Sequence, residues 1–66
     1  MTTFKAEMAR ANRSMELFSV SLTIYQANCQ RFSWEEAEAE RLKMQTALDD
    51  YLDAYASASR MMARAQ

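Results

Sequence analysis

The chain has 66 residues, half of them apolar, with a formal net charge of −1 and no glycine, proline or histidine. This length allows one small domain, and the missing residue types exclude glycine-dependent phosphate loops, the commonest general base and the commonest metal ligand. The single cysteine, Cys29, cannot form an internal disulfide, so we expect a reducing, cytoplasmic setting.

The first predicted element is a helix over about residues 3–31. Apolar residues recur in it at alternating spacings of four and three, which is the pattern of a coiled-coil seam. These residues are Phe4, Met8, Ala11, Met15, Phe18, Leu22, Tyr25, Cys29 and Phe32. Residues 18–24 also alternate apolar and small polar side chains, as a strand would, but no partner strand accompanies them. Because an isolated strand leaves backbone groups unpaired, we expect a helix here.

A turn is predicted at about residues 32–33, followed by a second helix over about residues 34–64. The second helix has its own seam, formed by Trp34, Ala37, Arg41, Met44, Leu48, Tyr51, Tyr55, Ala58, Met62 and Ala65. This seam is displaced by two residues from a continuation of the first, which is roughly 200° around a helix. A reversal of the chain brings the two seams together, and Ser33 with Glu36 has the pattern of a capping box. One bent or continuous helix is the alternative.

These elements predict a single all-α domain over residues 1–66, an antiparallel helical hairpin. Two helices that touch along one seam bury little apolar surface. The free energy gained by this burial is too small to offset the conformational entropy lost when 66 residues become ordered. Small chains compensate with disulfides, metals or oligomerisation, and only the last suits this composition. We therefore expect two hairpins to form a four-helix bundle, most simply a twofold homodimer. A partner from another protein is the alternative occupant of the same surface.

A second apolar stripe runs along the middle of the first helix, away from its seam. It makes that helix apolar nearly all round, which is typical of a buried helix. On the second helix, further apolar residues widen the seam in a similar way. The predicted protein-contact residues are Leu17, Val20, Ile24, Leu52 and Met61.

No catalytic, metal-binding or cofactor-binding residues are predicted. Cys29 has no histidine to activate it and is expected to be a buried small thiol. Methionines on or beside the seams are typical core filler, and the acidic residues are typical of a solvated helix face. We do not expect an enzyme, because no pair of nucleophile and base can be assembled.

Charge is distributed unevenly along the predicted hairpin. Residues 1–16 and 54–66, which form its open end, contain five cations and two acids, whereas residues 17–53 contain three cations and seven acids. The five cations are Lys5, Arg10, Arg13, Arg60 and Arg64. A basic end of this kind predicts, as an alternative function, contact with RNA or DNA phosphates. A third possibility is an amphipathic coat on a membrane or lipid inclusion.

In outline, the expected dimer resembles the plasmid-encoded RNA-binding four-helix dimers of hairpins, although it shares no motif with them. The segment Trp34-Glu35-Glu36 resembles the turn of WXG-type secreted helical hairpins, but it lacks their glycine and the chain is shorter. Neither resemblance transfers a functional residue to this sequence. The leading expectation is a small non-enzymatic interaction module, such as a regulator, adaptor or chaperone, that acts by helix–helix packing.

Overall fold

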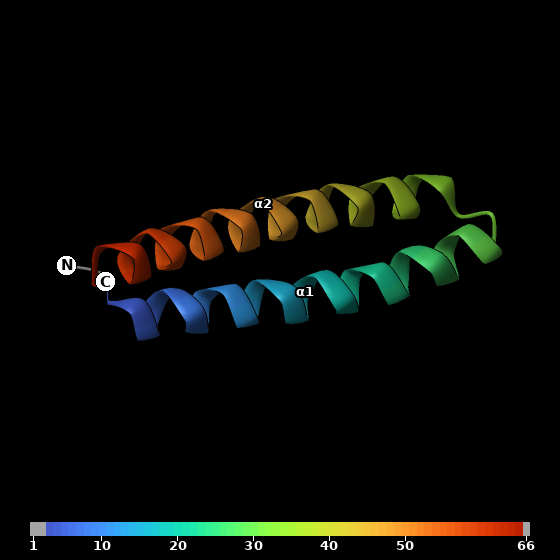
Figure 1. Cartoon of the computed structure of the whole chain (residues 1–66). Coiled ribbons are helices and arrows are strands. Elements are labelled where there is room, and N and C mark those ends of the chain that lie inside the picture. The colour runs from blue at the N-terminus through green and yellow to red at the C-terminus, as the bar shows by residue number, and fades with distance from the viewer. Residues whose placement is uncertain (1–2, 66) are drawn as a thin grey trace.

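The computed structural model describes residues 3–65, and the side chains of residues 3–64. It contains two α-helices, α1 (Phe4–Gln30) and α2 (Trp34–Ala65), which lie side by side in opposite directions (Figure 1). The hairpin measures 50 × 18 × 13 Å, with the start of α1 and the end of α2 at its open end. The predicted helical hairpin is confirmed, and the alternative of one continuous helix is wrong.

Helix α1 begins at Phe4, one residue after the predicted start at about residue 3. Thr3 is its N-cap, in an extended backbone conformation, and the Thr3 hydroxyl accepts a hydrogen bond from the Ala6 amide at 3.1 Å. The Thr3 carbonyl accepts a second bond, from the Glu7 amide, at 3.0 Å. These bonds satisfy amide groups that a bare helix end leaves without partners.

The turn between the helices is a Schellman motif made without glycine. The Ser33 amide donates to the Asn28 carbonyl at 2.8 Å, and the Phe32 amide donates to the Cys29 carbonyl at 3.1 Å. Phe32 has a φ of 60°, the left-handed conformation that glycine normally supplies at this position. For a residue with a Cβ atom, this conformation costs roughly 1–2 kcal/mol.

Aromatic contact supports the turn. The Phe32 ring meets the Trp34 ring edge-on, with their centroids 5.8 Å apart. The predicted capping box of Ser33 and Glu36 is wrong, because no side-chain hydrogen bond of that kind forms among the described residues. Ser33 instead starts α2 through its backbone carbonyl, which accepts from the Ala37 amide at 2.9 Å.

Small residues separate the two helices. The buried residues of α1 are Glu7, Ala11, Ser14, Ser21 and Asn28. Those of α2 are Ala37, Ala47, Ala54 and Ala58. Together they form the helix–helix seam, and their spacings of three, four, seven and ten are sums of the alternating threes and fours of a coiled coil. No large side chain is fully buried among the described residues.

The sequence-based seam is therefore partly wrong. Its spacing is correct, and Ala11 and Ala58 do lie between the helices. However, Phe4, Trp34 and Tyr55, which were predicted to pair across the hairpin, are exposed in it. Small side chains let two helix backbones approach more closely than large ones, so the alanines and serines occupy the line of contact. The larger side chains are displaced to its edge.

Candidate protein-interaction site

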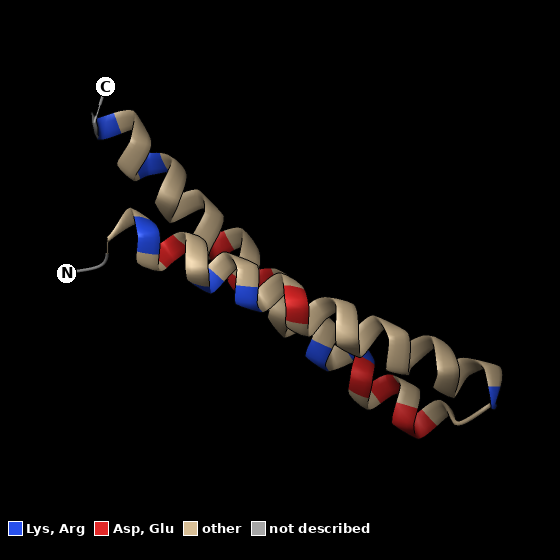
Figure 2. Ribbon diagram, turned by 90° about the horizontal axis from the view of Figure 1, so that it is seen from below, with Lys and Arg blue, Asp and Glu red and all other residues tan. Residues whose placement is uncertain are grey.

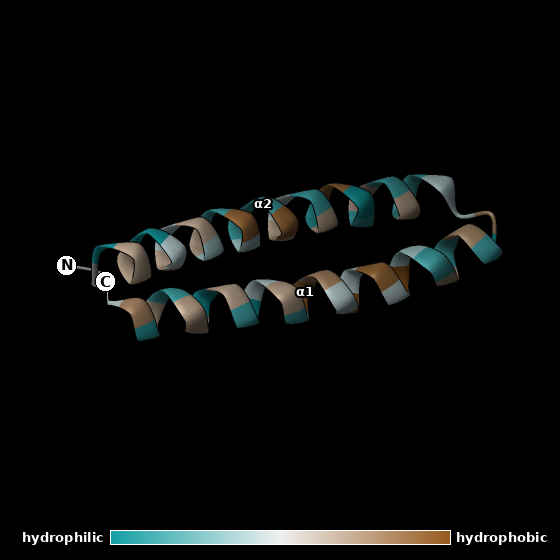
Figure 3. Cartoon of the chain, viewed as in Figure 1, coloured by the Kyte–Doolittle hydropathy of each residue, from teal (hydrophilic) through white to brown (hydrophobic). Residues whose placement is uncertain are grey.

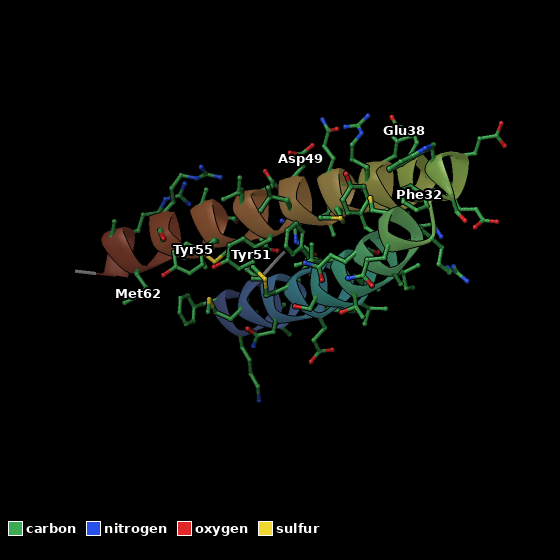
Figure 4. The ribbon with its side chains drawn as sticks, turned by 90° about the vertical axis from the view of Figure 1, so that its right-hand side faces the viewer. Phe32, Glu38, Asp49, Tyr51, Tyr55 and Met62 are labelled. Atoms are coloured by element: carbon green, nitrogen blue, oxygen red, sulfur yellow. The ribbon has the colours of Figure 1, made fainter. Side chains whose placement is uncertain are left out.

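The displaced large side chains form what we call the broad apolar face of the hairpin. On each helix they recur every seven residues, and each directly follows a seam position in the sequence. They therefore lie along one edge of the seam. On α1 they are Met8, Met15, Leu22 and Cys29. On α2 they are Trp34, Leu48, Tyr55 and Met62, and Arg41 occupies the remaining position of this series. Figure 4 shows Tyr51 and Tyr55 extending from α2 toward α1, and Asp49 pointing away from it.

At the turn end, residues of both helices influence the pKa of Tyr25, which lies beside this edge on α1. Cys29 of α1 and Arg41 of α2 both lie close enough to Tyr25 to influence its pKa. The side-chain hydrogen bond with Cys29 has the largest influence and raises the pKa of Tyr25, whereas the Arg41 charge lowers it. Cys29 is only partly buried in the hairpin, so the expected burial of this thiol is incomplete within one chain.

The opposite edge of the seam is apolar on α1 and mixed on α2. Here Leu17 and Ser21 line a groove of about 380 Å³ together with Leu42, Lys43 and Asp50 of α2. Leu17, Val20 and Ile24, which we call the Leu17 stripe, lie on the α1 side of this edge and are exposed. Figure 3 shows this apolar segment as the brown middle of α1. A large exposed apolar patch is uncommon on a soluble monomer and typically marks an interaction site.

The structure separates the five predicted contact residues into two groups. Leu17, Val20 and Leu52 are more than half exposed, at 59%, 58% and 55%, and Ile24 is 42% exposed. Met61 differs, because it is half-buried. It lies three residues after Ala58 and therefore continues the seam of α2. The eight apolar residues of the broad apolar face were assigned to the hairpin's own interior by sequence reasoning. The sequence shows the seven-residue repeat of these residues, but not that the smaller alanine side chains fit the line of contact better.

One polar cluster links the two helices near the open end. The Arg10 guanidinium donates to Glu7 of its own helix at 3.0 Å and to Asp53 of α2 at 2.8 Å. Glu7 is almost completely buried, so the Arg10 charge offsets the cost of placing a carboxylate in the seam. The Asp53 and Glu7 carboxylates also raise the pKa of Arg10, the hydrogen bond to Asp53 having the largest effect.

Other ion pairs lie within α2, and their side chains are exposed except for that of Glu40, which is largely buried. Arg41 donates to both carboxylate oxygens of Glu38, at 2.6 and 2.9 Å, which lowers the pKa of Glu38. Lys43 pairs with Glu40 at 3.2 Å. Exposed pairs three residues apart contribute little to stability, so these contacts mainly orient charged side chains on the helix surface.

The antiparallel arrangement gathers the predicted basic residues at the open end (Figure 2). Lys5, Arg13, Arg60 and Arg64 form no salt bridge with a carboxylate among the described side chains, whereas Arg10 is held by Glu7 and Asp53. Four of the nine acidic residues gather beside the turn, at the start of α2, and three more lie near the middle of that helix. The hairpin is thus electrostatically bipolar along its length.

The described residues contain no group of three or more acidic or thiol side chains placed to hold a metal ion. Neither described helix includes a segment long and apolar enough to cross a bilayer. In its fold, the chain is a two-helix antiparallel hairpin with exposed apolar surface on both edges of its seam. Comparison with protein-family models, with curated proteins and with solved structures finds no match to this chain.

Proposed function

We propose that this protein is a small non-enzymatic interaction module, a regulator, adaptor or chaperone that acts by helix–helix packing. The observation that supports this proposal is the inverted use of side-chain size in the hairpin. Alanine and serine are buried, whereas Leu17, Val20 and Tyr55 are at least half exposed. Since the large apolar side chains supply most of the free energy of burial, the isolated hairpin leaves a large part of that free energy unused.

A four-helix bundle of two hairpins is the assembly that we propose. In such bundles each helix contacts two neighbours, one within its hairpin and one across the bundle. The broad apolar face spans both helices and suits a second hairpin. The Leu17 stripe lies on α1 alone and suits a single amphipathic helix of a partner protein, docked by its own apolar side chains.

Sedimentation equilibrium at micromolar concentration tests the proposal. We expect a mass of twice the 7.6 kDa of one chain. We also expect the melting temperature to rise with protein concentration, because association stabilises the folded state by mass action. A monomer that melts cooperatively at a temperature independent of its concentration contradicts the proposal. In that case the hairpin would be stable while its apolar side chains remain in water.

The basic open end supports a second candidate function, the binding of RNA or DNA. Four of its cations, Lys5, Arg13, Arg60 and Arg64, have no described carboxylate partner and are exposed. Cations that contact phosphates release counterions, so binding of this kind weakens steeply as salt increases.

A salt titration separates the two candidates. Binding of a labelled RNA hairpin and a labelled DNA duplex is measured between 50 and about 200 mM salt, with Arg13→Gln and Arg60→Gln as the basic-end variants. Glu35→Gln, at the other end, is the matched control for a change of one charge. Salt-dependent binding that only the basic-end variants weaken supports the second candidate, and undetectable binding at low salt excludes it.

A further inference from the structure

The two edges of the seam differ in their suitability for a second copy of this chain. The broad apolar face receives large apolar side chains from α1 and from α2 along its whole length, whereas on the opposite edge α2 contributes one large apolar side chain, Leu42, beside the charged Lys43 and Asp50. A bundle core needs apolar side chains from all four helices. The broad apolar face is therefore the surface for self-association, although Val20, on the other edge, is more exposed than Met15 or Leu48.

Two twofold arrangements cover this face. In the first, the open ends of both hairpins lie together, and α2 of each copy packs on α1 of the other. In the second, the hairpins point in opposite directions, so that α2 packs on α2 and α1 packs on α1. Both bury the same face and have antiparallel neighbours throughout, so the choice depends on charge and on side-chain register.

Charge favours opposite directions. The first arrangement places two open ends of net positive charge together, and two acidic turn ends together (Figure 2). The second places the basic end of each copy beside the acidic end of the other. With the axis at Leu48, Arg60 then lies level with Glu36 of the second copy, and Arg64 lies level with its turn at residue 32, next to Glu35 and Glu36. Attraction between such ends replaces repulsion within a screening distance of about 8 Å at physiological salt.

Register on α2 favours the same choice. Leu48 is the middle member of the series 34, 41, 48, 55 and 62, and it lies near the midpoint of α2. A twofold axis through Leu48 places each Arg41 against Tyr55 of the second copy, where its guanidinium contacts an aromatic ring. In the first arrangement, Arg41 would instead face α1 of the second copy near Leu22 and Cys29, which offer no acceptor of comparable strength.

We propose that two copies pack through the broad apolar face in opposite directions, about a twofold axis through Leu48 of α2. This inference rests on the proposed function and specifies its partner as a second copy of this chain. Near the axis, Leu48 of one copy meets Leu48 of the other, and Met15 and Leu22 of both copies complete the α1 half of the core. The Leu17 stripe stays on the outside of this bundle.

Disulfide trapping tests the register. In a Cys29→Ser background, Leu48→Cys is expected to form a covalent dimer under mild oxidation, because residues at the axis lie within the distance of about 7 Å that a disulfide allows. In the alternative arrangement the two α2 helices are diagonal across the bundle, at about 14 Å given interaxial distances of 8–10 Å. Val20→Cys in the same background is the matched control, and it should stay uncrosslinked.

A distance between spin labels tests the direction. Gln30→Cys, also with Cys29→Ser, places one label per chain near the turn, on an exposed position. Opposite directions predict a separation of roughly 40 Å, from the rise of 1.5 Å per residue. Hairpins that point the same way predict labels at the same level, within about 20 Å of each other.

The outcomes distinguish this inference from the function on which it rests. A dimer that crosslinks through the Leu48→Cys variant and shows the long distance supports it. A sample that is dimeric by mass, but shows the short distance or crosslinks through Val20→Cys and not through Leu48→Cys, overturns the proposed packing and leaves the interaction module intact. A monomeric mass for the unmodified chain overturns both proposals.

Discussion

The small-residue seam predicts that enlarging one buried alanine destabilises the hairpin. Ala54 has an exposed fraction of 0% and lies where α2 contacts α1. Ala54→Leu adds three carbon atoms at a position with no space for them. Overpacking of this kind typically costs about 1–3 kcal/mol, because neighbouring side chains leave their preferred rotamers or the helices move apart.

Ala56→Leu is the matched control, since Ala56 lies on the exposed surface of the same helix. Leucine has nearly the same helix propensity as alanine, so this control should change the free energy of unfolding by less than about 0.5 kcal/mol. Both variants are unfolded in urea and followed by circular dichroism at 222 nm. Protein concentration is kept equal, because association contributes to the measured stability.

The result that refutes this reasoning is equal stability of the two variants. It would mean that a leucine fits at residue 54, and hence that the helices are farther apart in solution than in the hairpin described. A gain in stability for Ala54→Leu would go further. It would indicate that the large side chains predicted from the sequence, and not the alanines, occupy the contact line.

Three further predictions concern the turn, the N-terminal cap and the link between the helices. Phe32→Gly should be more stable than Phe32→Ala by about 1 kcal/mol in urea unfolding, because both remove the ring but only glycine adopts a positive φ without strain. If Phe32→Ala were the more stable variant, a positive φ at residue 32 would be excluded. Thr3→Ala should cost about 1 kcal/mol and Thr3→Ser much less, because serine keeps the hydroxyl that accepts from Ala6; equal losses would show that the cap is not formed. Asp53→Asn should slightly lower the melting temperature at low salt and make no difference in about 1 M salt, where the exposed pair with Arg10 is screened; a loss that persists in high salt would contradict this.

Both helices were predictable because their signals are local and agree with one another. The four–three spacing, the absence of glycine and proline, and the displacement of the second seam all indicate two helices with a reversal between them. The predicted bounds of the first helix, about residues 3–31, each lie within one residue of those observed for α1, Phe4–Gln30. The conformation of Phe32 was less predictable, because phenylalanine has no preference for a positive φ and adopts it here only because the helices must reverse.

The line of contact was not predictable from spacing alone. A stripe of apolar residues identifies the side of a helix that avoids water, but it does not identify which neighbour that side meets. In the hairpin, Ala11 and Ala54 are buried against the other helix. Met15 and Tyr55 lie at the edge of this contact and remain exposed. In the four-helix bundle that we propose, a stripe between these positions would point toward the bundle axis, so that assembly would bury a pattern wider than one hairpin can bury.

By itself, the sequence determined that the chain forms two long helices with a reversal near residue 32, because periodicity and capping act over a few neighbouring residues. It also determined that the molecule has more apolar surface than two helices can cover. The tertiary structure alone decided that alanine and serine lie between the helices and that the large side chains lie beside them. This choice depends on how closely two helix backbones approach, which is a property of the packed pair and not of either helix.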